Sequence, residues 1–132
     1  MKIGILGSNE VGKQLGKSFL QIGHEIIIGT NKPTTIDDWL NPEQTLTFYR
    51  GTHSDAASFG DIIVLCTLWN KTKEIIYSAG IENFENKILI DITYSDENFP
   101  GLISSNENDE EFIQQLLPNT RIVKAINILN RD

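Results

Sequence analysis

The chain has 132 residues, of which 39% are hydrophobic and 22% are charged. This length suits one compact domain, so we expect a single domain over residues 1–132. The formal charge of −7 argues against nucleic acid or an anionic membrane surface as a general partner, because both favour a basic face. The sequence shows no basic-then-apolar leader and no apolar run of the roughly 20 residues that cross a bilayer, so the expected location is the cytoplasm.

The chain opens with the pattern of a strand, a glycine-bounded turn and a helix. Lys2–Leu6 is a short apolar run that ends at Gly7, which is typical of a buried parallel strand. Apolar side chains then recur at three- and four-residue steps and predict an amphipathic helix that ends at Gly23. These side chains are Val11, Leu15, Phe19 and Ile22. A second strand follows at Ile26–Ile28, so the unit is a strand, helix, strand crossover of expected right hand.

The next segment predicts two short helices and a strand. Thr35 and Asp38 resemble an N-cap and its acidic partner for a short helix through Leu40. Weak alternation at Leu46–Tyr49 favours an edge-ward strand, and Ser54–Phe59 is expected to be a short helix.

The strongest strand signal is Asp61–Cys66, which is rich in β-branched residues and leucine. A helix is expected at Asn70–Ala79 and a fifth strand at Lys87–Ile92. Cys66 is the single cysteine and lies within an apolar run, so we expect a buried, inert thiol.

The last part of the chain predicts an irregular segment, a helix and a sixth strand. Thr93–Asn108 is polar and turn-rich, which favours a mobile flap. The helix begins near Asp109 and ends at Pro118, and Arg121–Ala125 forms the strand. Six strands that alternate with helices imply an α/β fold, a doubly wound parallel sheet in the order 3-2-1-4-5-6.

In such a sheet, ligands bind outside the carboxyl ends of the strands, beside the reversal of strand order. The first turn there is Gly7-Ser8-Asn9-Glu10-Val11-Gly12, close to the dinucleotide pattern G-x-G-x-x-G. Asn9 replaces the middle glycine but tolerates a positive φ, whereas Glu10 adds a carboxylate near an anion site. Two interpretations stay open for this turn alone: it binds a nucleotide, or its glycines only shape the chain.

The second turn, at Thr30, Asn31 and Lys32, distinguishes the nucleotides. Sites for NAD and for S-adenosylmethionine usually end the second strand with an acid that holds ribose hydroxyls, and this turn has none. Hydroxyls and a cation suit a 2′-phosphate, so NADP is favoured over NAD, with an ordinary solvated loop as the alternative.

Other candidate groups give weaker signals. His24 and His53 both fall in predicted loops, so a metal site or a catalytic triad has little support and no metal is expected. Trp69, at the exit of the fourth strand, would face the crevice where a nicotinamide lies; a core or partner-facing aromatic is the alternative.

Motifs along the whole chain, taken together, resemble the family of NADP-dependent oxidoreductases that reduce the deazaflavin coenzyme F420, and the related reductase domains of membrane metalloreductases. The matching residues are Lys2-Ile-Gly-Ile-Leu-Gly-Ser8, Val11-Gly12, Gly23-His24-Glu25, Ile28-Gly29-Thr30, Phe59-Gly60-Asp61, Trp69, Asp91-Ile-Thr93, Leu117-Pro118, Val123-Lys124-Ala125 and Asn127. Asn31 stands where the family usually has arginine, and Leu68 stands where it has proline.

The resemblance implies a Rossmann-type domain in which the first turn holds the pyrophosphate, the second holds the 2′-phosphate and the exit of the fourth strand lies along the nicotinamide. The cofactor-binding residues it implies are Gly7, Ser8, Asn9, Glu10, Val11, Gly12, Thr30, Asn31, Lys32, Thr67, Leu68, Trp69, Thr93 and Ala125. Hydride passes directly between rings in this family, so no catalytic acid or base is assigned.

The expected function is therefore an NADP(H)-binding oxidoreductase domain that positions the nicotinamide for hydride transfer to a flavin, a deazaflavin or another small acceptor. The alternative is a non-catalytic nucleotide-binding, sensing or interaction module. Family members continue past the motif Lys124-Ala125-x-Asn127 into a segment that completes the substrate site and often a dimer interface. A homodimer is thus a further expectation, and the sequence leaves open whether the chain is truncated or a natural minimal form.

Overall fold

The computed structural model describes residues 1–7, 10–30, 48–95 and 107–125. Within them, six parallel strands form one sheet in the order β3-β2-β1-β4-β5-β6, which confirms the predicted fold class and strand order. The strands are β1 (Lys2–Leu6), β2 (Glu25–Gly29), β3 (Phe48–Gly51), β4 (Ile62–Leu65), β5 (Ile88–Asp91) and β6 (Arg121–Lys124). The helices are α1 (Glu10–Gln21), α2 (His53–Phe59), α3 (Thr72–Ala79) and α4 (Glu107–Leu116), with short 3-10 helices η2 (Trp69–Lys71) and η3 (Ile81–Phe84).

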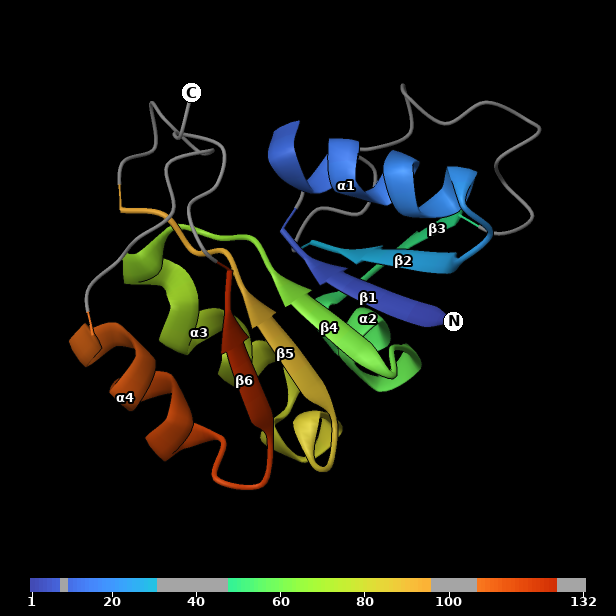
Figure 1. The fold of residues 1–132 in the computed structure, drawn as a ribbon. Coiled ribbons are helices and arrows are strands. Elements are labelled where there is room, and N and C mark those ends of the chain that lie inside the picture. The colour runs from blue at the N-terminus through green and yellow to red at the C-terminus, as the bar shows by residue number, and fades with distance from the viewer. Residues whose placement is uncertain (8–9, 31–47, 96–106, 126–132) are drawn as a thin grey trace.

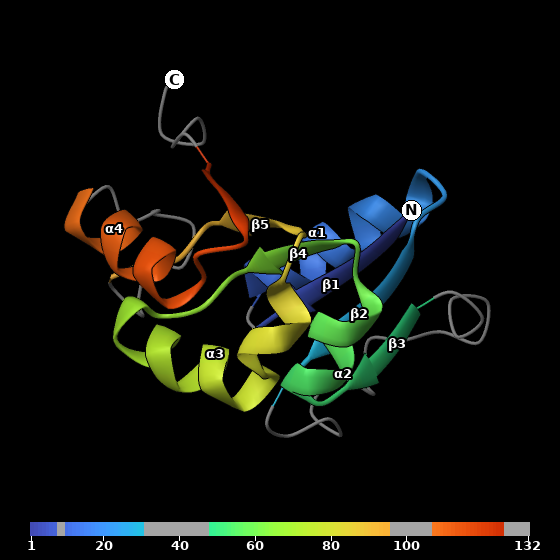
Figure 2. The same ribbon diagram turned by 90° about the horizontal axis from the view of Figure 1, so that it is seen from below.

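The helices cover the two faces of the sheet in separate layers. Helix α1 lies over one face, and α2, α3 and α4 lie over the other (Figure 1). The view from below shows α2 and α3 next to each other (Figure 2). This three-layer arrangement is the doubly wound architecture that alternating strands and helices imply.

Each face of the sheet has its own apolar core because successive side chains of a strand point to opposite faces. In β4, Ile63 and Leu65 are fully buried on the side of α2, α3 and α4, whereas Val64 packs on the side of α1. Cys66 continues the second set and is fully buried, which confirms the predicted buried thiol. Burial on both faces explains why these strands appear in the sequence as continuous apolar runs.

A close approach of backbone to backbone fixes α2 against β1. A Cβ atom on Gly4 would lie 2.1 Å from the carbonyl oxygen of Ala56 in α2. Glycine and alanine at this crossing let the helix pack directly on the strand, which places the N-terminal end of α2 beside the carboxyl ends of β1 and β2.

The start of α2 corrects one prediction. His53 was expected in a loop, but it is the first residue of the helix. The reason is a capping box: the Thr52 hydroxyl accepts the Asp55 N–H at 3.1 Å, and the Asp55 carboxylate accepts the Thr52 N–H at 2.9 Å. The box starts the helix one residue before the predicted Ser54.

A second correction concerns Ile22, which was expected to complete the apolar stripe of the first helix. Its side chain is 70% exposed. Helix α1 ends at Gln21, and the chain then turns through Gly23 at φ +96°, so Ile22 no longer follows the helical period.

The remaining elements agree with the predicted order, with small changes. The helix predicted at Asn70–Ala79 is divided into η2 and α3, and η3 was not predicted. The predicted helix through Leu40 and most of the predicted flap lie outside the described residues. Within the described part of the chain, no helix is long and apolar enough to cross a membrane.

Candidate functional site

The turns selected from the sequence meet at one edge of the sheet. Leu6 is in register with Gly29 and with Leu65, and Asp91 is in register with Leu65 and with Lys124. The residues that follow these positions therefore lie along the same edge. They include the predicted site residues Gly7, Thr30, Thr67, Leu68, Trp69, Thr93 and Ala125.

The first turn packs tightly against the end of β4. Gly7 has φ +120°, and a Cβ atom there would lie 2.1 Å from the Cys66 carbonyl oxygen, so this conformation needs glycine. Its N–H donates to the Gly29 carbonyl at 3.0 Å, which ties the turn to β2 as well. After Ser8 and Asn9, which lie outside the described residues, Glu10 begins α1 as an exposed acid.

Two further predicted residues of this turn hold α1 on the sheet. Val11 packs against the core beneath α1, and Gly12 is buried. These positions fix where the helix begins and so set the direction of its N-terminal N–H groups, the groups that bind anions in a dinucleotide turn.

The second turn begins at a buried hydroxyl. Thr30 is 5% exposed, and its N–H donates to the Gly51 carbonyl at 3.0 Å, so the start of the turn is fixed to the end of β3. Asn31 and Lys32 lie outside the described residues.

A pocket of about 280 Å³ lies between these two turns and the helices α2 and α3. Its lining residues are Gly7, Thr30, His53, Lys71, Glu74, Ile75 and Ser78. The last four are spaced i, i+3, i+4 and i+7, so they form one face of the segment that contains η2 and α3. Sequence reasoning did not select these residues as a site, because their spacing alone also suits a core-facing helix.

His53 joins α2 to α3 at this pocket. Its Nδ1 lies 3.3 Å from the Ser78 hydroxyl oxygen, and its side chain is largely buried. Burial lowers the pKa of His53, and the nearby carboxylate of Glu74 partly offsets this effect.

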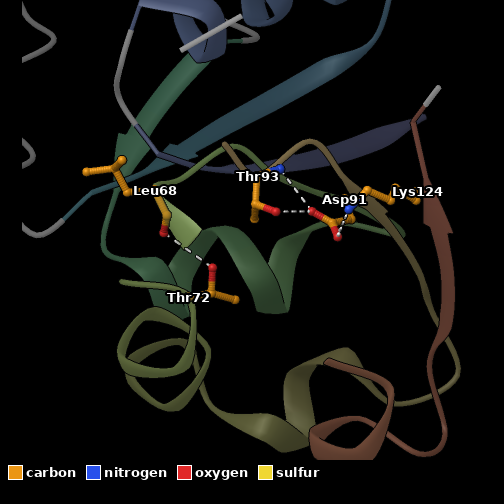
Figure 3. Close-up of polar contacts among 5 residues, drawn as sticks. All are labelled: Leu68, Thr72, Asp91, Thr93 and Lys124. Atoms are coloured by element: carbon orange, nitrogen blue, oxygen red, sulfur yellow. Dashed lines mark hydrogen bonds and ion pairs between the residues drawn. The ribbon is translucent and has the colours of Figure 1, made fainter. Parts of the chain in front are cut away.

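The ends of β5 and β6 carry a buried polar cluster of Asp91, Thr93 and Lys124 (Figure 3). Asp91 is fully buried, and its Oδ1 accepts the Thr93 N–H at 2.9 Å and the Thr93 hydroxyl at 2.7 Å. Its Oδ2 lies 4.0 Å from the Lys124 ammonium. Asp91 and Lys124 were not selected as site residues, although both belong to motifs that carried the family resemblance.

Among the described residues, buried polar atoms without a hydrogen-bond partner lie at this end of the sheet, and two of them belong to the Asp91–Lys124 ion pair. Among the described residues, three buried side-chain atoms have no hydrogen-bond partner: Thr67 Oγ1, Asp91 Oδ2 and Lys124 Nζ. They come from the ends of β4, β5 and β6, where this fold binds its ligands. Such groups are costly in an interior and are often completed by water or a ligand.

The segment after β4 is held to the segment after β5. The Trp69 N–H donates to the Tyr94 carbonyl at 2.7 Å. Within the segment after β4, the Thr72 hydroxyl donates to the Leu68 carbonyl at 3.3 Å (Figure 3). The Trp69 ring packs edge-on against Phe112 of α4, with centroids 5.7 Å apart. This contact agrees with the core role considered for Trp69, and its role toward a cofactor stays a prediction. No cluster of metal-ligating side chains occurs within the described ranges.

A parallel sheet in this order, with a glycine turn after β1 and a pocket at the reversal of strand order, defines a Rossmann-type domain. A model of the family "NADP oxidoreductase coenzyme F420-dependent" matches residues 2–95, which is more than half of the chain. The chain therefore belongs to this family. The prediction of NADP is confirmed at the level of the family, as is the prediction of an oxidoreductase domain.

Individual proteins extend this likeness. The metalloreductase STEAP3 of Rattus norvegicus is 22% identical over 129 residues, which are 98% of this chain and 25% of the relative. The metalloreductase STEAP2 of Homo sapiens is 23% identical over 135 residues, with 97% and 24% covered. The chain thus spans about a quarter of the length of these curated relatives.

Solved structures with the same fold superpose on most of this chain. A protein of Arthrobacter sp. FB24 described as an F420-dependent NADP reductase superposes with a TM-score of 0.79 at 27% identity, over 96% of this chain and 62% of that one. An imine reductase from Myxococcus stipitatus in complex with NADP⁺ superposes with a TM-score of 0.68 at 18% identity, over 98% and 43%. The second likeness supports the fold alone.

Proposed function

We propose that this chain is the NADP(H)-binding domain of an oxidoreductase and positions the nicotinamide for direct hydride transfer to a flavin, a deazaflavin or another small acceptor. The observation that carries the proposal is that Gly7 and Thr30 line one pocket. They come from the two turns that hold the pyrophosphate and the 2′-phosphate in the family. No acid follows β2 in the sequence at Thr30, Asn31 and Lys32, which favours NADP over NAD.

The residues present suit such a cofactor. Gly7 allows the tight turn after β1, where a side chain would meet the end of β4, and this is the role of the first glycine in a dinucleotide turn. Toward the other end of the crevice, the unpartnered Thr67 hydroxyl and the fixed Thr93 lie where the nicotinamide half would bind. Leu68, Trp69 and Ala125 complete that half in our proposal, and Ser8, Asn9, Glu10, Val11 and Gly12 surround the pyrophosphate.

The bound dinucleotide supplies the hydride in this proposal, and the chain contributes position and exclusion of water. The apolar cores beneath the strand ends keep that edge of the sheet rigid, and the Asp91–Thr93 hydrogen bonds fix the turn after β5. We propose further that residues 1–132 fold as one domain and that a second copy supplies part of the acceptor site.

One observation favours a second candidate, a non-catalytic nucleotide-binding or sensing module. Glu10 is an exposed acid in the first turn of α1, the end of the helix that would face the pyrophosphate. A carboxylate there repels phosphate and lowers affinity.

Fluorescence titration tests the function. The chain has two tryptophans, so a Trp39→Phe variant leaves Trp69, beside the proposed nicotinamide site, as the reporter. We expect a saturable response below millimolar concentration, tighter for NADPH than for NADH. No response to either nucleotide would refute the proposal.

Turnover separates the two candidates. NADPH oxidation is measured with a panel of flavins, a deazaflavin, quinones and ferric chelates. A rate with any of them supports the oxidoreductase, whereas tight NADPH binding without turnover by any acceptor favours the sensing module.

A further inference from the structure

Lys71 lines the pocket between the two phosphate-binding turns, and no sequence signal selected it. We propose that the Lys71 ammonium binds a phosphate group of the dinucleotide. This inference rests on the proposed function and assigns one residue of its specificity.

The position of Lys71 follows from the packing of the first turn on β4. The Cβ position of Gly7 lies 2.1 Å from the Cys66 carbonyl and 3.3 Å from the Thr67 methyl carbon, so the chain leaving β4 passes directly beside the first turn. Four residues after Thr67, η2 ends at Lys71. The same pocket reaches Thr30, so its walls include both turns.

The charge balance of the pocket singles out this residue. Lys71 is exposed, and within the described part of the chain its ammonium has no carboxylate at ion-pair distance. The pocket's carboxylate, Glu74, acts electrostatically on His53, whose pKa is lowered by burial. Among the described residues that line the pocket, Lys71 therefore carries the permanent positive charge. A phosphate in a partly enclosed site needs such a charge.

Capping of α3 gives no reason for a lysine at this position. Lys71 is the N-cap of α3, and its side chain makes no capping hydrogen bond. Lys71 is also the last residue of η2, but toward the dipole of α3 a cation at the N-terminus has the unfavourable sign, and lysine is not a preferred N-cap. A bound phosphate would reverse this disadvantage, because it pairs with the ammonium at the end of the helix that attracts anions.

The test compares Lys71→Gln with Lys73→Gln by calorimetric titration of NADPH and NADH. Lys73 is an exposed lysine of the same helix that does not line the pocket, so its substitution changes the net charge equally. We expect Lys71→Gln to weaken NADPH binding roughly tenfold, Lys73→Gln to change it less than about twofold, and Lys71→Arg to retain most of the affinity. Thermal unfolding of each variant checks that the fold is intact.

The two nucleotides identify the phosphate. A loss for NADPH with little change for NADH assigns Lys71 to the 2′-phosphate, and equal losses for both assign it to the pyrophosphate. If the parent protein prefers NADPH and Lys71→Gln retains both affinities, the lysine inference is wrong while the proposed function stands. If the parent protein binds neither nucleotide, both proposals fail.

Discussion

The two halves of the strand-end crevice use polar groups in opposite ways. Beside the ends of β1 and β2, Lys71 of η2 and Glu74 of α3 are exposed on the wall of the pocket. At the ends of β5 and β6, Asp91 and Thr93 are fully buried and bonded to each other at 2.7 and 2.9 Å. The first half can adjust its charges to a ligand, whereas the second is fixed before any ligand arrives.

The energetic consequence differs as well. Exposed charges cost little to keep and contribute little to stability, so the pocket of the first half can be optimised for binding. A buried carboxylate loses its hydration and must recover it through hydrogen bonds. Asp91 does so at Oδ1 through Thr93, while its Oδ2 has only the Lys124 ammonium at 4.0 Å. In this second half, at the ends of β5 and β6, the same contacts therefore determine both the stability of the domain and the geometry of the site. We call it the rigid half, and we call the half with the pocket the open half.

The largest effect is expected where the two halves meet, at Gly7. Gly7→Ala places a methyl group 2.1 Å from the Cys66 carbonyl at φ +120°, so steric overlap adds to backbone strain. We expect a loss of about 4 kcal/mol in the free energy of unfolding, measured by urea denaturation.

Gly23→Ala is the matched control for Gly7→Ala. Gly23 also has a positive φ, +96°, but a Cβ atom there would have no neighbour within 4 Å. Only the backbone cost of about 1 kcal/mol should remain. Similar losses for the two variants would show that Gly7 is not a point of close contact.

The next largest effect tests the rigid half. Asp91→Ala leaves the Thr93 N–H and hydroxyl without their acceptor and the Lys124 ammonium without a nearby opposite charge. We expect a loss of about 3 kcal/mol by urea denaturation. Asp91→Asn keeps an acceptor oxygen for Thr93 and should cost less than Asp91→Ala. A loss below about 1 kcal/mol for Asp91→Ala would show that the cluster is not a stabilising element.

The contrast between the halves also explains which features the sequence predicted. The strands were predictable because burial on both faces makes runs such as Ile62–Leu65 continuously apolar. Gly7 and Thr30 were predictable because the topology fixes where strands end. Lys71 and His53 were not, because their pocket depends on where α3 lies relative to α2, and no local pattern encodes that placement.

Asp91 shows a different limit. An acid at the end of an apolar strand suggests a solvated turn as readily as a buried acceptor. The role of Asp91 follows from its register with Lys124 and from the hydrogen bond that the Thr93 hydroxyl donates to its Oδ1. Both are contacts of the folded chain. The prediction for Ile22 was wrong because the helical period of the sequence continues one residue beyond the end of α1. Ile22 is apolar and in phase with the helix, but it lies after Gln21 and is exposed.

A smaller effect is expected at His53, which lines the pocket of the open half, and it concerns how stability depends on pH. The folded state lowers the pKa of His53 below its ordinary value of 6.5, mainly through burial. The unfolded chain therefore takes up a proton first as the pH falls. The contribution of His53 to stability is complete above about pH 6.5 and is lost as the pH falls below that value.

Urea denaturation between pH 5 and pH 8 checks this sign. His53→Gln should reduce the fall in unfolding free energy below about pH 6.5, whereas His24→Gln, at the other histidine, should retain the His53 contribution. A parent protein that becomes more stable as the pH falls through this range, with that rise removed by His53→Gln, would contradict the lowered pKa.

The smallest effect on stability is expected for Thr67→Val. Among the described residues, the Thr67 hydroxyl is buried without a hydrogen-bond partner, so an isosteric methyl group should change the free energy of unfolding by no more than about 0.5 kcal/mol, or raise it. Thr93→Val is the matched comparison, because its hydroxyl donates to the Asp91 carboxylate at 2.7 Å and its loss should cost about 2 kcal/mol. If the Thr67 hydroxyl instead serves the nicotinamide half of the crevice, Thr67→Val should weaken NADPH binding while stability stays constant. Such a separation of affinity from stability would mark Thr67 as a ligand group, and a Thr67→Val loss as large as that of Thr93→Val would mark it as part of the rigid half.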